Sequence, residues 1–198
     1  TVWSNDVVAD QPSEAFYVHD LDNDVVVSPT VLPLGRRPGQ FRSRHGFGYT
    51  VHEGEESGLA MELVQTIATD DPVKRVRLHI SNRLAAKRRL RITFYADTVM
   101  GQRRATAAHF TTSEYDPISN ALFLRNRWNA DFGDTVLFAD MQGRQTDWTT
   151  SRRAVLGNNG SLRSPSGLFA QLPFGKETGG GYDPCIAMQM EIDVSPHG

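Results

Sequence analysis

The alternation of side-chain types along residues 39–52 constrains the fold of this chain more than any other feature of the sequence. One parity holds Phe41, Ser43, His45, Phe47, Tyr49 and Val51, and the other holds Arg42, Arg44, Gly46, Gly48, Thr50 and His52. A period of two residues projects side chains to opposite faces of a strand, whereas a helix needs a period near 3.6. The segment therefore predicts one long β-strand.

The same period recurs along much of the chain, and helical periodicity is nearly absent, with at most a turn around 149–156. Strands are predicted at 15–19, 25–28, 59–67, 76–80, 90–96, 107–112, 121–125, 135–140 and 186–194. The turn-forming residues 20–24 predict a hairpin between the first two. Many strands separated by turn signals indicate an all-β fold, a large antiparallel β-sandwich, with residues 1–198 as a single domain.

Residues 157–184 differ from the rest because glycine and proline recur throughout them. They predict a long loop, and a loop of this length in a compact domain is usually functional or disordered. Its apolar side chains favour an ordered loop that packs on a surface: Leu162, Leu168, Phe169, Leu172 and Phe174.

Charge and cysteine content exclude several classes of protein. The formal net charge of −2 over 198 residues argues against nucleic-acid binding, which requires a basic surface. No apolar run approaches the roughly 20 residues that span a membrane, so no direct membrane contact is expected. Cys185 is the only cysteine, which excludes an intrachain disulfide and fits a reducing compartment. We expect Cys185 to be a small buried hydrophobic residue.

The sequence predicts no cofactor, no metal site and no catalytic residue. Residues 20–24 begin like a calcium loop, but Val25 and Val31 stand where glycine and glutamate are needed. The six histidines show no close pair at ligand spacing on a helix, which gives zinc little support. Paired carboxylates such as Glu55 with Glu56 lie in predicted turns and point into solvent.

Two segments combine aromatic and polar side chains in a way that suits sugar binding, residues 44–49 and residues 125–129. Aromatic faces stack on sugar rings, and arginine or asparagine supplies directional hydrogen bonds. The alternative interpretation places Phe47, Tyr49 and Trp128 in the core or in an interface. The candidate carbohydrate-binding residues are Arg44, His45, Tyr49, Arg125, Asn126 and Trp128.

Ten short segments together resemble one family of enzymes. They are Trp-Ser-Asn-Asp at 3–6, Glu-Ala-Phe-Tyr-Val-His-Asp at 14–20, Ser-Pro-Thr at 28–30, Arg-His-Gly-Phe-Gly-Tyr-Thr at 44–50, Asp-Pro-Val-Lys at 71–74, Leu-His-Ile-Ser-Asn at 78–82, Tyr-Ala-Asp at 95–97, Arg-Asn at 125–126, Gly-Asn-Asn-Gly-Ser-Leu at 157–162 and Gly-Tyr-Asp-Pro-Cys at 181–185. In this order they resemble the N-terminal β-sandwich of the inverting disaccharide phosphorylases, the cellobiose and chitobiose phosphorylases of glycoside hydrolase family 94. The similarity is greatest to the corresponding C-terminal part of bacterial cyclic β-1,2-glucan synthases.

The resemblance implies a supersandwich that precedes a linker and a catalytic barrel of helical hairpins, which carries the general-acid aspartate. No such barrel is encoded in this sequence, so the catalytic acid is expected downstream of Gly198. Further strands are expected upstream of Trp3. The chain is therefore expected to be a piece of a longer polypeptide. The stretch Arg127-Trp128-Asn129 departs from the tyrosine-bearing stretch that is common in the family.

The resulting hypothesis is a non-catalytic accessory domain of a β-glucan-processing enzyme. It would support the catalytic barrel, take part in a homo-oligomer and form the edge of the cleft that binds a β-linked glucan. The expected location is cytoplasmic, as part of an inner-membrane enzyme. The alternatives are an autonomous carbohydrate-binding module and a purely structural interaction domain.

Overall fold

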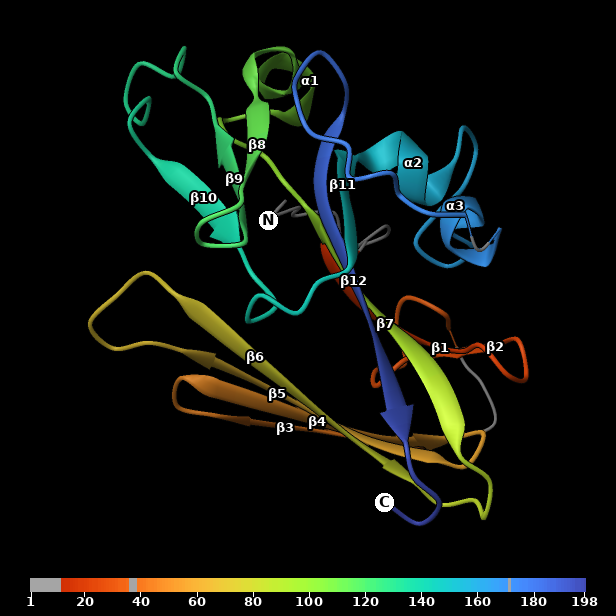
Figure 1. The fold of residues 1–198 in the computed structure, drawn as a ribbon. Coiled ribbons are helices and arrows are strands. Elements are labelled where there is room, and N and C mark those ends of the chain that lie inside the picture. Colours follow the sequence, from red (N-terminus) through yellow and green to blue (C-terminus); the bar gives the residue numbers. More distant parts are fainter. Residues whose placement is uncertain (1–11, 36–38, 171) are drawn as a thin grey trace. The chain divides into compact units, whose positions relative to one another are not determined.

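The computed structural model describes residues 12–35, 39–170 and 172–198, so the motif at 3–6 lies outside the described residues. Strands predominate, their pairing is antiparallel, and the helices are short, which confirms the predicted all-β class (Figure 1). The strands are β1 (Glu14–Asp20), β2 (Val25–Val27), β3 (Gln40–Gly46), β4 (Tyr49–Glu56), β5 (Leu59–Ile67), β6 (Lys74–Asn82), β7 (Arg88–Asp97), β8 (Thr112–Asp116), β9 (Ala121–Arg125), β10 (Val136–Ala139), β11 (Asp147–Ser151) and β12 (Pro184–Val194). The helices are α1 (Arg104–Ala107), η1 (Ala108–Phe110), α2 (Arg152–Leu156) and α3 (Ser166–Phe169), and none in the described part of the chain is long and apolar enough to cross a membrane.

The strands form sheets with the orders β11-β12-β7-β1-β2, β10-β9-β8 and β3-β4-β5-β6. The contacts divide the chain into two compact units. Unit 1 holds Thr93–Met190 with the segment before Phe16, and unit 2 holds Phe16–Ile92 with Glu191–Gly198. The strands β7 and β12 run through both units.

In unit 2, β3 to β6 form a sheet of consecutive hairpins with one polar and one apolar face. The register pairs Val51 with Val64 and Leu63 with Leu78. Leu59, Met61 and Leu63 of β5 are buried on one face. Arginine, glutamate and histidine side chains occupy much of the other face, as the sequence alternation in β6 predicts.

The prediction that residues 39–52 form one continuous strand is wrong. The chain reverses at Phe47 and Gly48, and Gly46 pairs with Tyr49 across the hairpin. Gly48 has a φ of +73°, a backbone conformation that glycine adopts without steric cost. Because the turn contains two residues, the parity of the faces changes across it. Arg44 therefore shares a face with Tyr49, not with Thr50.

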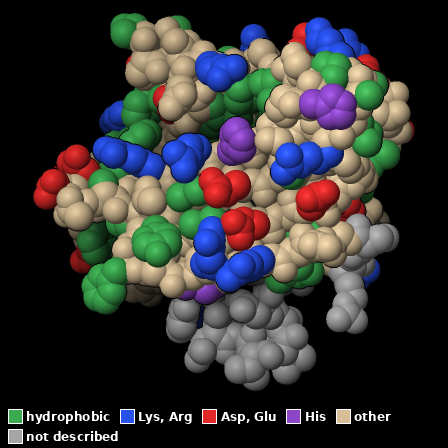
Figure 2. Space-filling view, turned by 90° about the horizontal axis from the view of Figure 1, so that it is seen from below, with side chains coloured by type: hydrophobic (Ala, Val, Ile, Leu, Met, Phe, Trp, Pro, Cys, Tyr) green, Lys and Arg blue, Asp and Glu red, His purple; other side chains and the backbone are tan. Residues whose placement is uncertain are grey.

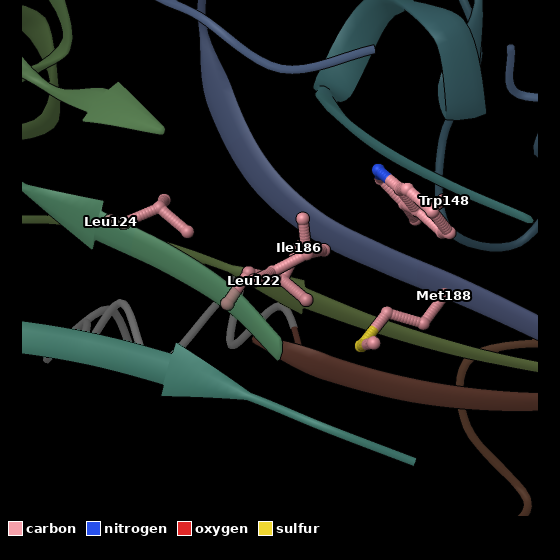
Figure 3. Packing of buried hydrophobic residues seen from close by; sticks show 5 residues of the cluster. All are labelled: Leu122, Leu124, Trp148, Ile186 and Met188. Carbon is pink, nitrogen blue, oxygen red and sulfur yellow. The ribbon is translucent and has the colours of Figure 1, made fainter. Parts of the chain in front are cut away.

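In unit 1, the buried core joins β9, β11 and β12 (Figure 3). The first half of β12 is buried on both faces, which is why its sequence shows an apolar run there instead of an alternation. Cys185 is fully buried in this half, as predicted, and burial raises the pKa of its thiol, so the thiol stays protonated and unreactive. The core cluster comprises Leu122, Leu124, Trp148, Ile186 and Met188.

Two further predictions about elements of unit 1 are wrong. Of residues 107–112, predicted as a strand, Ala107 ends α1 and residues 108–110 form η1, because the alanine-rich run around Ala105 favours a helical turn, and β8 begins only at Thr112. The strand β11 was not predicted, since its residues Trp148, Thr149, Thr150 and Ser151 are all buried and leave no alternating pattern.

The turn between β1 and β2 confirms the predicted hairpin and anchors a buried ion pair. Asp20 accepts hydrogen bonds from the backbone N–H groups of Asp22 (3.0 Å) and Asn23 (3.3 Å). The Arg88 guanidinium donates through Nε to Asp20 Oδ2 at 2.8 Å, and its Nη1 donates to the Ser57 carbonyl at 2.8 Å. This pair joins the end of β1 to the start of β7 and to the turn between β4 and β5.

Within residues 157–184, Leu162, Leu168 and Phe174 are buried, as the prediction of a packed loop requires. Phe169 and Leu172 are exposed, so that prediction is wrong for these two side chains.

Candidate carbohydrate-contacting residues

Arg44 and Tyr49 lie on the polar face of the β3–β4 hairpin. The Arg44 Nη2 atom is 2.9 Å from Glu53 Oε1 across the hairpin, and both side chains are about half exposed. The Tyr49 ring covers Gly46, where a Cβ atom would come within 2.2 Å of the ring. Gly46 has no side chain and could therefore allow another molecule to approach closely. The Tyr49 ring of the same chain occupies that space.

His45 lies on the opposite face, beside His52. Its Nδ1 atom is 3.0 Å from Thr50 Oγ1, and the Nδ1 atom of His52 is 2.7 Å from Ser43 Oγ. The two imidazole rings meet edge to face with centroids 6.2 Å apart. Burial lowers the pKa of His52, and the positive charges of His45 and Lys74 lower it further. Since His45 and Arg44 occupy different faces, the three hairpin candidates do not form a single pocket.

The second group of candidates belongs to unit 1 and surrounds the end of β9. The Arg125 Nη2 atom is 3.3 Å from Glu114 Oε1 on β8. Asn126 is buried: its Nδ2 donates to the Met100 carbonyl at 2.8 Å, and its Oδ1 accepts the Trp128 backbone N–H at 3.1 Å. Asn126 therefore holds the turn that carries Trp128, and its amide groups are used by the backbone.

Trp128 is 80% exposed and lies beside Phe110, which is 48% exposed. The ring centroids are 5.9 Å apart, with an angle of 38° between the planes. We call Phe110 and Trp128 the aromatic platform. The interpretation that places Trp128 in the core is wrong, and an exposed pair of rings can stack on the apolar face of a sugar.

Sequence reasoning missed a closed ring of four charges in unit 1. Asp97 Oδ1 is 3.1 Å from Arg104 Nη2 and 3.3 Å from Arg152 Nε. Asp183 completes the ring, with Oδ1 2.7 Å from Arg104 Nε and Oδ2 3.6 Å from Arg152 Nη1. The charges balance, so the ring is a structural connection between β7, the helices and the segment before β12. Its members are far apart in sequence. The motifs at 95–97 and 181–185 contain Asp97 and Asp183, but neither motif indicates that the two aspartates share arginine partners.

Three hydroxyl groups form a second polar cluster that the sequence did not indicate. Thr150 Oγ1 is 2.6 Å from both Ser113 Oγ and Tyr182 Oη, and Ser113 Oγ donates to the Gly179 carbonyl at 2.9 Å. The cluster fixes the glycine-rich stretch before β12. Among the described residues, no group of three or more His, Cys, Asp or Glu side chains is placed to hold a metal ion.

Comparison with known proteins agrees with the fold. The model of the glycosyl hydrolase 94 supersandwich domain matches residues 1–198. The chain is 32% identical over 194 residues to the cyclic beta-(1,2)-glucan synthase NdvB of Rhizobium meliloti (strain 1021), covering 98% of this chain and 7% of that protein. It is 24% identical over 158 residues to the solabiose phosphorylase of Paenibacillus borealis, covering 77% of this chain and 20% of that protein. The resemblance drawn from the sequence motifs is confirmed: the chain belongs to glycosyl hydrolase family 94, as its supersandwich domain.

Proposed function

We propose that this chain is the non-catalytic β-sandwich of a β-glucan-processing enzyme, in which it supports the catalytic domain, takes part in dimerisation and borders the sugar cleft. The observation that carries the proposal is the family match over the whole chain, combined with its small share of the relatives' length. A domain that accounts for 7% of a glucan synthase leaves ample chain for a catalytic domain elsewhere.

The electrostatics of the acidic groups support a non-catalytic role. Inverting cleavage of a glycosidic bond needs a carboxylic acid whose pKa is raised, so that it can protonate the leaving oxygen. Burial acts to raise the pKa of Asp20, but hydrogen bonds from Asn23 and Arg88 outweigh it and hold the pKa below its usual value. Asp97 and Asp183 are paired with Arg104 and Arg152.

The aromatic platform is the contact that we assign to the sugar. Trp128 offers an exposed ring that loses little conformational freedom on binding, because Asn126 holds its backbone. Arg44 and Tyr49 on the polar face of the β3–β4 hairpin, with His45 on its opposite face, are proposed as a separate sugar contact made by unit 2. Arg125 contributes through its pair with Glu114 and keeps β8 and β9 in register beside the platform.

The test uses the full-length enzyme that contains this domain. Trp128→Ala should raise KM for a β-glucan substrate several-fold, with kcat within twofold of the wild type. Phe132→Ala is the matched control, since Phe132 is another exposed aromatic residue of the same connection. Equal KM values for Trp128→Ala and the wild type would show that the aromatic platform does not contact the substrate. The isolated 198-residue chain should release no glucose 1-phosphate from β-glucan and phosphate.

An autonomous carbohydrate-binding module is the second candidate, and the exposure of the aromatic platform is the observation that favours it. In that case Trp128→Ala would abolish sugar binding by the isolated chain. An accessory domain uses the platform only when the rest of the enzyme supplies the opposite wall of the cleft. In that case the substitution has no effect on the isolated chain.

A further inference from the structure

The polar face of the β3–β6 sheet contains a groove. Cross-strand partners project to the same face of a sheet, so the register defines rows of side chains. One row runs Gln40, Glu55, Ala60 and Ser81 across the four strands. This row contributes to the lining of a hollow of about 540 Å³, and the short side chains of Ala60 and Ser81 lie at its β5 and β6 end.

The adjoining row supplies one wall of the groove. It runs Arg42, Glu53, Glu62 and His79. Arg83 lines the groove at the end of β6. Acidic and basic side chains thus lie next to one another over this sheet, as Figure 2 shows.

Two of the carboxylates have an arginine beside them that lies outside the groove. Arg44 Nη2 is 2.9 Å from Glu53 Oε1, and Arg77 Nη2 is 3.8 Å from Glu62 Oε1. In the part of the chain that the structure describes, the charged groups of Arg42, Glu55 and Arg83 have no ion-pair partner. The groove therefore offers one carboxylate that is hydrogen-bonded in place, that of Glu53, beside charged groups that remain available to a ligand.

The balance of charge decides the class of ligand. The carboxylates of Glu53, Glu55 and Glu62 face the guanidinium groups of Arg42 and Arg83. Arg44 and Arg77 lie beside two of these carboxylates from outside the groove, so the groove favours neither a polyanion nor a polycation. A carboxylate accepts two hydrogen bonds side by side, and a guanidinium donates two. Neighbouring hydroxyl groups on a sugar ring match both arrangements, because each hydroxyl both donates and accepts.

We infer that this groove binds a neutral oligosaccharide, as a site separate from the aromatic platform. Its volume lies within the range of about 300–1,000 Å³ that is usual for small-molecule sites. The choice of a glucan as the oligosaccharide rests on the proposed function. The groove itself requires only a neutral chain of linked sugar rings with vicinal hydroxyls.

The test is a calorimetric titration of the 198-residue chain with a linear β-1,2-linked gluco-oligosaccharide. The wild-type chain should bind with a Kd of about 1 mM, a weak value suited to an open groove. Ala60→Tyr fills the hollow and should weaken binding at least tenfold. Val64→Tyr is the matched control, because Val64 lies on the same strand and the same face but outside the groove, and it should bind like the wild type.

Two further variants keep the proposal testable if Ala60→Tyr fails to fold. Arg42→Ala and Glu55→Ala remove the available charged groups without filling the hollow, and each should weaken binding several-fold. Trp128→Ala should bind like the wild type, which separates this site from the aromatic platform.

Four outcomes would overturn the inference. The first is no heat of binding by the wild-type chain at 10 mM oligosaccharide. The second is equal loss in Ala60→Tyr and Val64→Tyr. The third is loss in Trp128→Ala alone, which would place sugar binding at the platform. If Ala60→Tyr changed only the assembly of the full-length enzyme, the groove would be a protein contact and the inference would be wrong, while the proposed function would stand.

Discussion

Arg88 forms a buried ion pair with Asp20 in unit 2. Its side chain is 4% exposed, and that of its partner Asp20 is 1% exposed. Desolvating such a pair costs nearly as much as its mutual attraction returns, so the pair adds little net stability by itself. Removing one member is different, because it leaves an uncompensated charge in a buried position.

We expect Arg88→Met to lower the free energy of unfolding by about 3–5 kcal/mol. Urea denaturation of the isolated chain measures this. The neighbouring Arg89→Met is the control, since Arg89 is exposed and its substitution should change stability by about 0.5 kcal/mol or less. Similar losses in the two variants would show that Asp20 is satisfied without Arg88.

The same pair makes unit 2 sensitive to acid. Burial acts to raise the pKa of Asp20, but its hydrogen bonds to Asn23 and Arg88 and to the Asp22 backbone outweigh burial and lower the pKa in the folded chain. A lowered folded pKa means that the unfolded chain binds the proton first. The contribution to stability is therefore complete above the ordinary carboxyl pKa, near 3.9, and is lost as the pH falls through the lower folded value.

We therefore expect the unfolding free energy of the wild type to fall more steeply between pH 5 and pH 2 than that of Asp20→Asn. Parallel urea titrations at several pH values measure the two slopes. Asp70→Asn, in an exposed turn, should follow the wild type. Identical slopes for wild type and Asp20→Asn would remove Asp20 as the acid-sensitive group.

At this scale, the sequence indicates which residue types suit sugar binding, but not what each of these residues does in the fold. Trp128 is exposed, as a sugar-stacking residue must be. The side-chain amide of Asn126 is instead already hydrogen-bonded to the Met100 carbonyl and to the Trp128 N–H. The first of these bonds joins positions 26 residues apart, and no local pattern encodes it.

The β3–β4 hairpin keeps the alternating pattern of residues 39–52, although these residues form two strands and not the one strand that the pattern predicts. The alternation persists through residues 46–49 because a two-residue turn returns the chain to an extended conformation at once. The glycines flanking Phe47 were the available turn signal. The sheet character and the faces of β5, β6 and the second half of β12 could be predicted, because there one side is buried and the other is wet.

The contact between Gly46 and Tyr49 is specific to this hairpin and can be measured as a coupling. Gly46→Ala places a methyl group within 2.2 Å of the Tyr49 ring, so this half-exposed ring must turn aside and the chain should lose about 0.5–1.5 kcal/mol. In a Tyr49→Ala background the ring is absent, and Gly46→Ala should cost at least about 0.5 kcal/mol less. A double-mutant cycle from urea denaturation gives the coupling. Additive effects would mean that the ring does not occupy the space over Gly46.

On the scale of the whole molecule, the sequence predicted the all-β class and the family, but not the division into two compact units. That division passes through β7 and β12, each of which contributes to both units. Strand periodicity depends only on residues close together in sequence. It therefore predicts that a strand forms, but not which distant side chains pack against each half of the strand. The ring of Asp97, Arg104, Arg152 and Asp183 was invisible to sequence analysis for the same reason.

The surface of unit 1 leads to a prediction about assembly. The strand β10 pairs only with β9 among the described strands, so its outer edge presents backbone N–H and C=O groups to solvent. Its exposed Val136 and Phe138 add apolar surface, and an uncharged edge of this kind pairs readily with another chain. We expect the isolated chain to self-associate at tens of micromolar, a range set by ordinary interface strengths.

Phe138→Lys places a charge on the edge strand and should weaken association at least tenfold in sedimentation equilibrium. Ile118→Lys, at an exposed turn outside the strand, should leave it unchanged. A wild-type chain that sediments as a clean monomer would show that the β10 edge is blocked within the chain itself.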